Sequence, residues 1–525
     1  MAKDTQPETS LRRRDLLGGL VATGTVVAVG ASCRGEDVRE PSSTGPLVET
    51  PATLPDGLRS NHFVVHNTKP LALEARRAAL GAGLITPVSR FFVRNNLPRP
   101  GDHIVEHADA WTLDIIGVAQ PGSMRLADLK RMVPTTITMV LQCSGNGRAF
   151  FKHAPSGSQW ATGAAACVMW TGVRVADVLA ARGGAVDKTR YLTATGGEPL
   201  PADVERDLVV VERSVPLAKG IDDCILAWEL NGEPIPISHG GPLRLIVPGY
   251  FGCNNIKYVR TLAATQEQSS AKIQAKGYRF RPIGEKGAPD QPSMWRMPVK
   301  SWFNGPGADG ESLPPGRHTF HGVAFSGERG VRSVEVSTDG DAWVVAKLTT
   351  PDLGRDAWRT FHVPLDLVEG RHTIYCRATD TRGDTQPDAR PENERGYGHN
   401  GWRDHGLQVF VSAAARPHTA PGESAGTSAA PLATQPTPVD LSESARAGRE
   451  VFVDGTSPSC GACHTLADAE TIGAIGPNLN ELQPTAEQVS RAVRDGVGIM
   501  PSMGDVLSEA QLRDVAAYVV EATTN

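Results

Sequence analysis

The segment Cys460-Gly461-Ala462-Cys463-His464 constrains this chain more than any other stretch of its sequence. Two thiols separated by two residues and followed by an imidazole are typical of c-type haem attachment, in which the thiols bind the vinyl groups and the histidine binds the iron. A CxxC pair could instead be redox-active or bind zinc. The adjoining histidine, the single CxxC in the sequence and a methionine downstream favour haem. We therefore predict one covalent haem held by Cys460, Cys463 and His464.

Helix signals lie around this motif. Thr485-x-x-Gln488 and Ser508-x-x-Gln511 have the pattern of helix capping boxes. The residues after the second box form one apolar face, which we interpret as core, and they are Leu512, Val515, Ala516 and Val519. This pattern predicts a small all-α domain over residues 441–525. Gly498-Ile499-Met500-Pro501 resembles the axial methionine loop of small class I cytochromes c, which makes Met500 the expected second iron ligand and Met503 the alternative.

A second constraint is a strand that ends at a cysteine. Thr135 to Leu141 carries β-branched and apolar residues and predicts a buried strand. The loop Gln142-Cys143-Ser144-Gly145-Asn146-Gly147-Arg148 follows, and its glycines and asparagine tolerate unusual backbone angles. Cys143 is thus a candidate ligand at a strand end. A lone cysteine is more often a small buried hydrophobe, and its position alone favours that interpretation.

Three motifs in order change the interpretation of Cys143. They are Phe92-Val93-Arg94-Asn95, the loop Gln142 to Arg148, and the run from His239-Gly240-Gly241-Pro242-Leu243-Arg244 to Pro248-Gly249. Together they resemble the sulfite oxidase family of molybdenum enzymes, over roughly residues 60 to 412. The resemblance implies a molybdenum–molybdopterin cofactor with Cys143 as the metal ligand. A thiolate is a soft ligand of the kind that transition metals accept.

The resemblance also assigns roles to single residues. The family's substrate arginines match Arg94, Arg148 and Arg395, and its active-site tyrosine matches Tyr278. Its pterin-binding positions match Asn95, His239, Arg244 and Lys257. Guanidiniums bind oxyanions through paired hydrogen bonds and keep their charge at any ordinary pH. Taken singly, each arginine would more often form a structural salt bridge, and the tyrosine would more often be core.

Two positions depart from the family pattern. Asn96 stands where many relatives carry histidine, which puts substrate affinity and proton handling in question. Asn254 stands where a basic residue is frequent, which predicts one weaker pterin contact. The remaining cysteines, Cys167, Cys224, Cys253 and Cys376, are interpreted as buried thiols without a function.

Composition and local patterns divide the chain. Its 525 residues, 40% hydrophobic and 21% charged, suit a soluble globular protein of about three domains. The expected segments are a signal peptide at 1–33, a spacer at 34–58, a molybdopterin-binding domain at 59–298, an immunoglobulin-like dimerisation domain at 299–412, a flexible linker at 413–440 and a cytochrome c domain at 441–525. The dimerisation role and the expected homodimer come from the resemblance.

Patterns within the two larger segments predict their fold. Short strands at Trp111–Val118, Tyr191–Thr195, Leu208–Val211 and Leu243–Val247, with a helix at Val175–Ala181, indicate a mixed α+β domain. Alternating strands at Val331–Ser337 and Arg371–Ala378, with turn signals between them, indicate a β-sandwich. Nucleotide binding in the first of these domains has no support, because no GxGxxG or Walker motif occurs between residues 61 and 298.

The N-terminus predicts export. Arg12-Arg13-Arg14-Asp15-Leu16-Leu17 is followed by an uncharged stretch to Ser32, which is typical of a twin-arginine signal and predicts a periplasmic or extracytoplasmic protein. A transmembrane anchor is the alternative, but the stretch is short and rich in glycine and threonine. Gly30-Ala31-Ser32-Cys33 also resembles a lipoprotein cleavage box, so a lipid anchor on Cys33 stays open.

The sequence thus predicts a sulfite dehydrogenase that oxidises sulfite to sulfate at molybdenum. Its electrons would pass to the chain's own haem and then to an external acceptor, a cytochrome c. One alternative is a sulfane dehydrogenase-like component of thiosulfate oxidation, and another is an electron-transfer haem protein with an inactive molybdenum-type scaffold. A net charge of −5 without long basic runs excludes nucleic acid as the expected partner.

Overall fold

The computed structural model describes residues 54–201, 204–415, 441–456, 459–469, 471–472, 479–496 and 500–524. The chain divides into two compact units, Met1–Arg39 and Glu40–Asn525, and every described residue lies in the second. The expected signal peptide with Cys33, most of the 34–58 spacer and nearly all of the 413–440 linker lie outside the described residues. In the described part, no helix is long and apolar enough to span a membrane.

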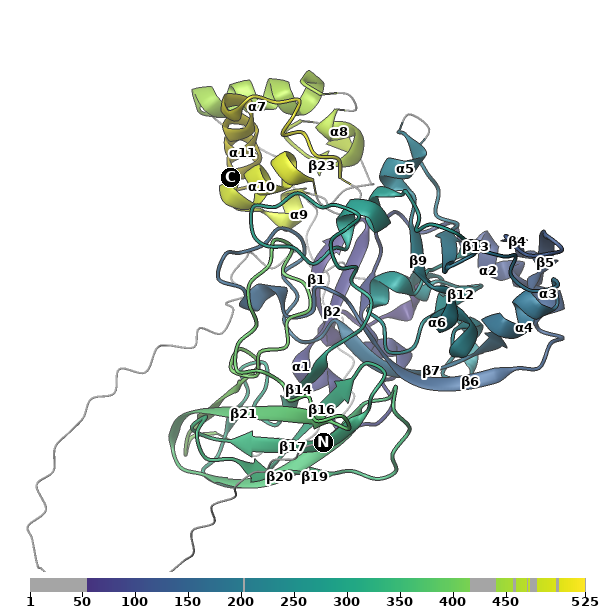
Figure 1. Cartoon of the computed structure of the whole chain (residues 1–525). Helices are drawn as coiled ribbons and strands as arrows, with labels where there is room; N and C mark the ends of the chain where they lie inside the picture. Colours follow the sequence, from purple (N-terminus) through teal and green to yellow (C-terminus); the bar gives the residue numbers. More distant parts are fainter. Residues whose placement is uncertain are drawn as a thin grey trace, which may run out of the picture. The chain divides into compact units, whose positions relative to one another are not determined.

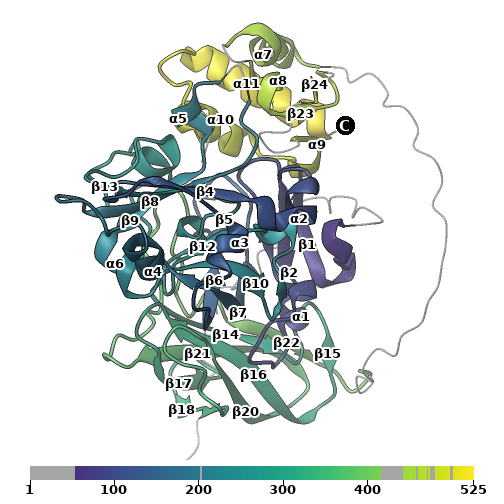
Figure 2. The same ribbon diagram turned by 90° about the vertical axis from the view of Figure 1, so that its right-hand side faces the viewer.

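Three sheets form the mixed α+β domain (Figure 1, Figure 2). The first, in the order β1-β2-β3, contains β1 (Phe63–Thr68), β2 (Leu71–Ala75) and β3 (Val93–Arg94). The second, β11-β10-β7-β6 with β12 beside β10, contains β6 (Thr135–Gln142), β7 (Ala165–Arg174), β10 (Ile225–Leu230), β11 (Glu233–Pro234) and β12 (Arg244–Ile246). The third, β5-β4-β13-β8-β9, contains β4 (Thr112–Ile116), β5 (Gly122–Arg125), β8 (Tyr191–Gly196), β9 (Glu212–Pro216) and β13 (Val259–Thr265).

The helices of this domain are short. They are α1 (Arg77–Leu80), α2 (His103–Glu106), α3 (Leu126–Leu129), α4 (Val175–Ala180), α5 (Arg206–Val209) and α6 (Leu217–Asp222). The predicted strand at Leu208–Val211 is wrong, because the chain makes the helical turn α5 there and β9 begins only at Glu212. A run of four apolar residues has no period of its own, so a helical turn buries it as well as a strand does.

The next domain is a β-sandwich, as predicted. One sheet, in the order β14-β16-β20-β19, contains β14 (Val299–Gly305), β16 (Gly316–Ser326), β20 (Arg359–Leu367) and β19 (Lys347–Leu348). The other, β15-β22-β21-β17-β18, contains β15 (Ser312–Leu313), β22 (Leu407–Val411), β21 (Gly370–Asp380), β17 (Val331–Ser337) and β18 (Val344–Val345). Inward residues such as Phe303, Phe320, Val334 and Ile374 are fully buried and form one core.

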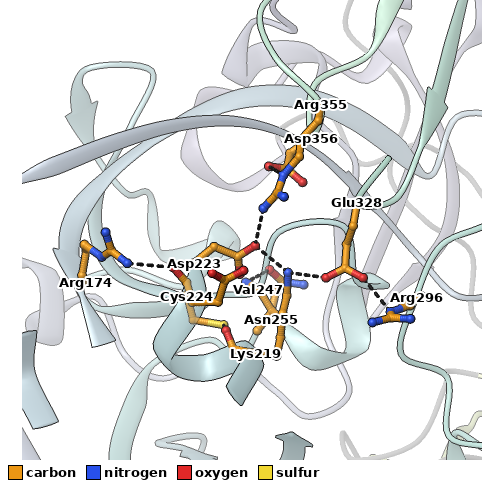
Figure 3. A network of polar contacts seen from close by, with 11 residues as sticks. Arg174, Lys219, Asp223, Cys224, Val247, Asn255, Arg296, Glu328, Arg355 and Asp356 are labelled. Atoms are coloured by element: carbon orange, nitrogen blue, oxygen red, sulfur yellow. Dashed lines mark hydrogen bonds and ion pairs between the residues drawn. The ribbon is translucent and has the colours of Figure 1, made fainter. Parts of the chain in front are cut away.

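An ion-pair network connects α6 with loops of the sandwich (Figure 3). The Lys219 Nζ lies 2.7 Å from a carboxylate oxygen of Asp223 and 2.8 Å from one of Glu328. Glu328 also pairs with Arg296 at 2.6 Å, and Asp223 pairs with Arg355 at 3.1 Å. Lys219, Asp223 and Glu328 are poorly exposed, and such charges are tolerated when each has an opposite partner. The network therefore links the two domains at their junction.

The C-terminal segment is helical, with α7 (Glu443–Asp454), α8 (Cys460–Cys463), α9 (Leu479–Leu482), α10 (Ala486–Asp495), α11 (Glu509–Thr524) and the short strands β23 (Thr465–Leu466) and β24 (Thr471–Ile472). Both predicted capping boxes are confirmed. The Thr485 hydroxyl accepts from the Gln488 N–H at 3.3 Å, and the Gln488 side chain accepts from the Thr485 N–H at 2.9 Å. Ser508 and Gln511 form the same pair of bonds. The predicted apolar face of α11 is buried.

Candidate functional site

The loop after β6 holds Cys143 by backbone and side-chain bonds. The Cys143 N–H donates to the Ala164 carbonyl at 2.9 Å, which extends the pairing of β6 with β7 by one residue. The Asn146 side chain then accepts from the Ala164 N–H and donates to Gln142, each at 3.1 Å. Gly147 has a φ of 96°, a conformation that favours glycine. The strand-to-loop transition predicted for Cys143 is confirmed.

Cys143 lines a cavity, which we call the thiol cavity. Seven residues proposed from the sequence line it, namely Arg94, Asn95, Cys143, His239, Arg244, Lys257 and Tyr278. They come from several strands and turns that are far apart in the chain. Packing of the sheets therefore brings them to one place, and Arg148 and Arg395 are not among the lining residues.

One end of the thiol cavity is basic and buried. Arg244 Nη1 donates to the His239 carbonyl at 2.6 Å, and Lys257 Nζ donates to the Asn95 side chain at 2.6 Å. The His239 ring stacks on Phe91, with centroids 4.5 Å apart. Burial lowers the pKa of His239 well below its usual value and lowers the pKa of Arg244 to about 10. His239 is therefore neutral, while Arg244 stays charged.

Glu198 is a residue of this end that sequence reasoning missed. Glu198 follows the end of β8 in Gly196-Gly197-Glu198. The glycine pair at the strand end is the sequence signal that could have pointed to a loop residue here. Its Oε2 is buried and has no hydrogen-bond partner within the described residues. Burial raises the pKa of this carboxyl to about 7, against a smaller opposing effect of Lys257. His239 Nε2 and Arg244 Nε are likewise buried and unpartnered in the described part.

The other end of the cavity carries neutral donors beside Arg94. The Tyr278 hydroxyl donates to the Asn96 side-chain oxygen at 3.4 Å, and the Ser144 hydroxyl donates to the Cys253 sulfur at 3.2 Å. Burial raises the pKa of both Tyr278 and Cys253, so each keeps its proton at neutral pH. Cys253 is only partly buried and lines the cavity with Cys143, so its interpretation as a simple buried thiol is wrong.

Arg148 and Arg395 lie beside the cavity and bind backbone carbonyls. Arg148 Nε donates to the Arg395 carbonyl at 3.1 Å and its Nη1 donates to the Ser158 carbonyl at 2.8 Å. Arg395 Nη1 donates to the Gly496 carbonyl at 2.9 Å. Burial lowers the pKa of Arg148, and nearby Tyr397 and Cys143 oppose that effect. Of the three proposed substrate arginines, only Arg94 faces the cavity directly.

Asn254 also has a defined partner. Its side-chain oxygen accepts from Arg213 Nη2 at 3.0 Å, and its amide donates to the Phe251 and Met294 carbonyls. Asn254 is fully buried, and Arg213 is 1% exposed. A cation therefore does lie at this position, but it is Arg213 of β9 and not residue 254 itself.

The haem motif lines a second cavity, which we call the haem cavity. Cys460, Cys463, His464, Met500 and Met503 line it. Its apolar lining includes Phe452, Leu479, Leu482, Val489, Val493, Val515 and Val519. Both methionines remain candidates for the second iron ligand. Arg94 and Asn96 line this cavity as well as the thiol cavity, so the two cavities share a wall.

Comparisons with known proteins agree with this arrangement. Residues 100–273 match the oxidoreductase molybdopterin binding domain, residues 291–409 the Mo-co oxidoreductase dimerisation domain, and residues 443–519 the cytochrome C oxidase, cbb3-type, subunit III family. Mitochondrial sulfite oxidase of Homo sapiens is 33% identical over 388 residues, 70% of this chain and 69% of that protein. Sulfite oxidase of Gallus gallus is 31% identical over 372 residues, 66% of this chain and 77% of that protein.

A solved structure is also similar, that of the sulfane dehydrogenase SoxCD from Paracoccus pantotrophus. Its TM-score is 0.55 and its sequence identity 27%, over 65% of this chain and 87% of that chain. These comparisons confirm the predicted fold, which is a molybdopterin domain, a β-rich dimerisation domain and a small helical cytochrome c region. They also indicate the two predicted cofactors, molybdenum–molybdopterin and haem c.

The described residues fit both cofactors. The unpartnered atoms of His239, Arg244 and Glu198 offer donors and an acceptor at the basic end of the thiol cavity. Donors suit a phosphate, and a carboxyl oxygen can accept from the amino and ring N–H groups of a pterin. Cys143 provides the soft ligand for the metal. The apolar haem cavity with its two thiols and an imidazole suits a haem ring.

Proposed function

Because the chain belongs to the sulfite oxidase family, we propose that it is a sulfite dehydrogenase that passes electrons through its own haem to an external cytochrome c. The observation that carries the proposal is the shared wall of Arg94 and Asn96 between the thiol cavity and the haem cavity. Arg94, which can bind the substrate anion, thus also borders the cavity that suits the haem, the proposed electron acceptor. When bound, the molybdenum cofactor supplies the two-electron oxidation and the haem accepts electrons singly.

We assign the chain's own residues the following tasks. Cys143 holds the metal, and Arg94 binds the oxyanion through its guanidinium. Tyr278 offers a protonated hydroxyl to the same end of the cavity. The basic end of the cavity, with His239, Arg244 and Lys257, holds the pterin phosphate and polar edge, and Glu198 accepts from its N–H groups. Burial of these groups excludes water and strengthens each hydrogen bond.

Sulfite-driven reduction of the haem tests the proposal. Stopped-flow mixing of the oxidised protein with sulfite should reduce the haem at a rate independent of protein concentration, because transfer occurs within one chain. Cys143→Ser should abolish this reduction and leave the oxidised haem spectrum unchanged, since Cys143 lies outside the haem cavity. Full turnover in the Cys143→Ser protein, or a rate that rises with protein concentration, would contradict the assignment.

A second candidate is oxidation of a protein-bound sulfane, which the similarity to SoxCD favours. Reduction of cytochrome c by the purified protein with free sulfite separates the two functions. A sulfane dehydrogenase would need its carrier-bound substrate instead. The third alternative, an inactive scaffold, is disfavoured because the thiol cavity contains Cys143, Arg94 and Tyr278 together.

The match to a dimerisation domain supports a homodimer formed through the β-sandwich. We propose export by the twin-arginine route from Arg12-Arg13-Arg14, which would carry a folded, cofactor-loaded protein into the periplasm. Fractionation of cells that express the full chain, with and without replacement of Arg13 by lysine and Arg14 by lysine, tests this location.

A further inference from the structure

Tyr397 lies beside the site and lines neither cavity. Its side chain is 2% exposed. Its backbone N–H donates to the Asn393 side chain and its carbonyl accepts from that side chain, each at 2.9 Å. These bonds fix the backbone from which the ring projects, in the long connection between β21 and β22.

The ring of Tyr397 contacts both tyrosine and arginine residues of the site. It is stacked on Tyr278, with centroids 5.3 Å apart and planes inclined by 26°. The Cζ atoms of Arg148 and Arg395 lie 5.4 Å and 5.9 Å from its centroid. On Tyr278 the Cζ atom of Arg213 lies 5.5 Å from the ring centroid. We call these five side chains the tyrosine–arginine stack.

Among the described residues, the three arginines of the stack have no acidic partner. In the part of the chain that the structure describes, none of them forms an ion pair, although Arg148, Arg213 and Arg395 are only 6%, 1% and 4% exposed. Their N–H groups donate to backbone carbonyls and to neutral side chains. The negative face of an aromatic ring attracts a guanidinium within about 6 Å. The two tyrosines therefore offset part of the repulsion among these like charges.

We propose that Tyr397 is a positioning residue of this site. It holds the ring of Tyr278, which lines the thiol cavity, and keeps the guanidiniums of Arg148 and Arg395 beside the cavity, where their charge acts on a bound sulfur oxyanion. The inference rests on the proposed function for the identity of the anion. When the cations are already held in place, binding of the anion does not have to order them, so the binding free energy is more favourable. Without the aromatic face, the guanidiniums separate and the anion binds more weakly.

The test uses the full-length protein with both cofactors and the variants Tyr397→Leu and Tyr397→Phe. Sulfate, the expected product, is titrated calorimetrically at constant ionic strength, and KM and kcat are measured with sulfite. Tyr397→Leu should raise the sulfate Kd and the sulfite KM about tenfold and change kcat much less, because the bound anion and the transition state lose the same stabilisation relative to the free protein. Tyr397→Phe keeps the ring and should stay near the wild type.

Tyr375→Leu is the matched control. Tyr375 packs against Trp402 in the sandwich, with centroids 5.3 Å apart, and it belongs to neither cavity. This variant should keep the sulfate Kd and the sulfite KM of the wild type. If Tyr397→Leu lacks molybdenum or haem, Tyr397→Met replaces it, because the flexible methionine side chain adapts to an irregular space without an aromatic face.

An unchanged sulfate Kd in the leucine or methionine variant overturns the inference. Equal weakening in Tyr397→Phe also overturns it, because the hydroxyl and not the ring face would then be responsible. Failure of the proposed function gives a different result. The wild type would not oxidise sulfite, yet sulfate would still bind more tightly to the wild type and to Tyr397→Phe than to Tyr397→Leu.

Discussion

Lys300 Nζ donates a hydrogen bond to the backbone carbonyl of Asn146 at 3.0 Å. Lys300 lies on β14 of the sandwich and is fully buried, whereas Asn146 lies in the loop that follows Cys143. Burial lowers the pKa of Lys300 to about 7, and Glu74 and Cys143 act in the opposite direction. The sandwich domain therefore supports the cysteine loop of the preceding domain.

Replacing Lys300 by methionine is expected to lower cofactor occupancy. The Asn146 carbonyl would lose its donor, which costs about 1–3 kcal/mol when the group stays buried. Methionine keeps most of the volume, so the fold should survive. We expect the molybdenum-to-haem ratio, from metal analysis and haem absorbance, to fall about twofold or more. Lys347→Met, on the exposed part of β19, is the control, and a ratio like that of the wild type in Lys300→Met would contradict the role.

Glu198→Gln is expected to change how stability depends on pH in cofactor-free protein. The folded pKa of about 7 lies above the ordinary 4.5, so the folded state retains a proton that the unfolded state loses. The stabilisation that comes from this proton is complete below pH 4.5 and is lost as the pH rises to about 7. Above that pH, the glutamine variant should be more stable by about 1–3 kcal/mol.

Thermal unfolding of both proteins between pH 4.5 and pH 8 measures this difference. Glu205→Gln, which changes an exposed carboxyl, is the control and should follow the wild type. If the wild type and Glu198→Gln have parallel pH profiles, the Glu198 carboxyl is not protonated in the folded state.

Lys219→Met should destabilise the junction of the two large domains. Lys219 is the cation shared by Asp223 and Glu328, and its side chain is only 6% exposed. Asp223 keeps Arg355 and Glu328 keeps Arg296, but each carboxylate loses its charged hydrogen bond to the buried Lys219, which costs about 1.5–3 kcal/mol. Near-ultraviolet circular dichroism should show earlier unfolding, while the haem absorbance change stays near its wild-type midpoint. Lys130→Met removes an exposed pair with Asp109 and should cost less than about 1 kcal/mol.

Met500 and Met503 both line the haem cavity, and mutation can show which of them binds the iron. We expect Met500→Ala to abolish the methionine-to-iron charge-transfer absorption of the oxidised haem and to lower its reduction potential, because a methionine ligand raises that potential. Met503→Ala should keep the absorption, since Met503 is mainly a buried core residue. The opposite result would make Met503 the ligand.

Local patterns predicted the elements of this protein well where they had a clear period or cap. The strand before Cys143, the alternating β17 and β21 and both capping boxes agree with the structure. The run Leu208–Val211 misled the prediction because it is short and uniformly apolar, and so it contains no period. Such signals depend only on neighbours a few residues apart.

By itself, the sequence determined the Cys143 loop, the haem motif and the order of the three domains, because each depends on residues close together in the chain. Only the tertiary structure decided that Glu198 joins His239 and Lys257, that Arg94 borders both cavities, and that Tyr397 contacts Tyr278. These contacts follow from how sheets and domains pack across long stretches of chain, and the free energy of that packing is a sum over many buried residues that no local pattern records.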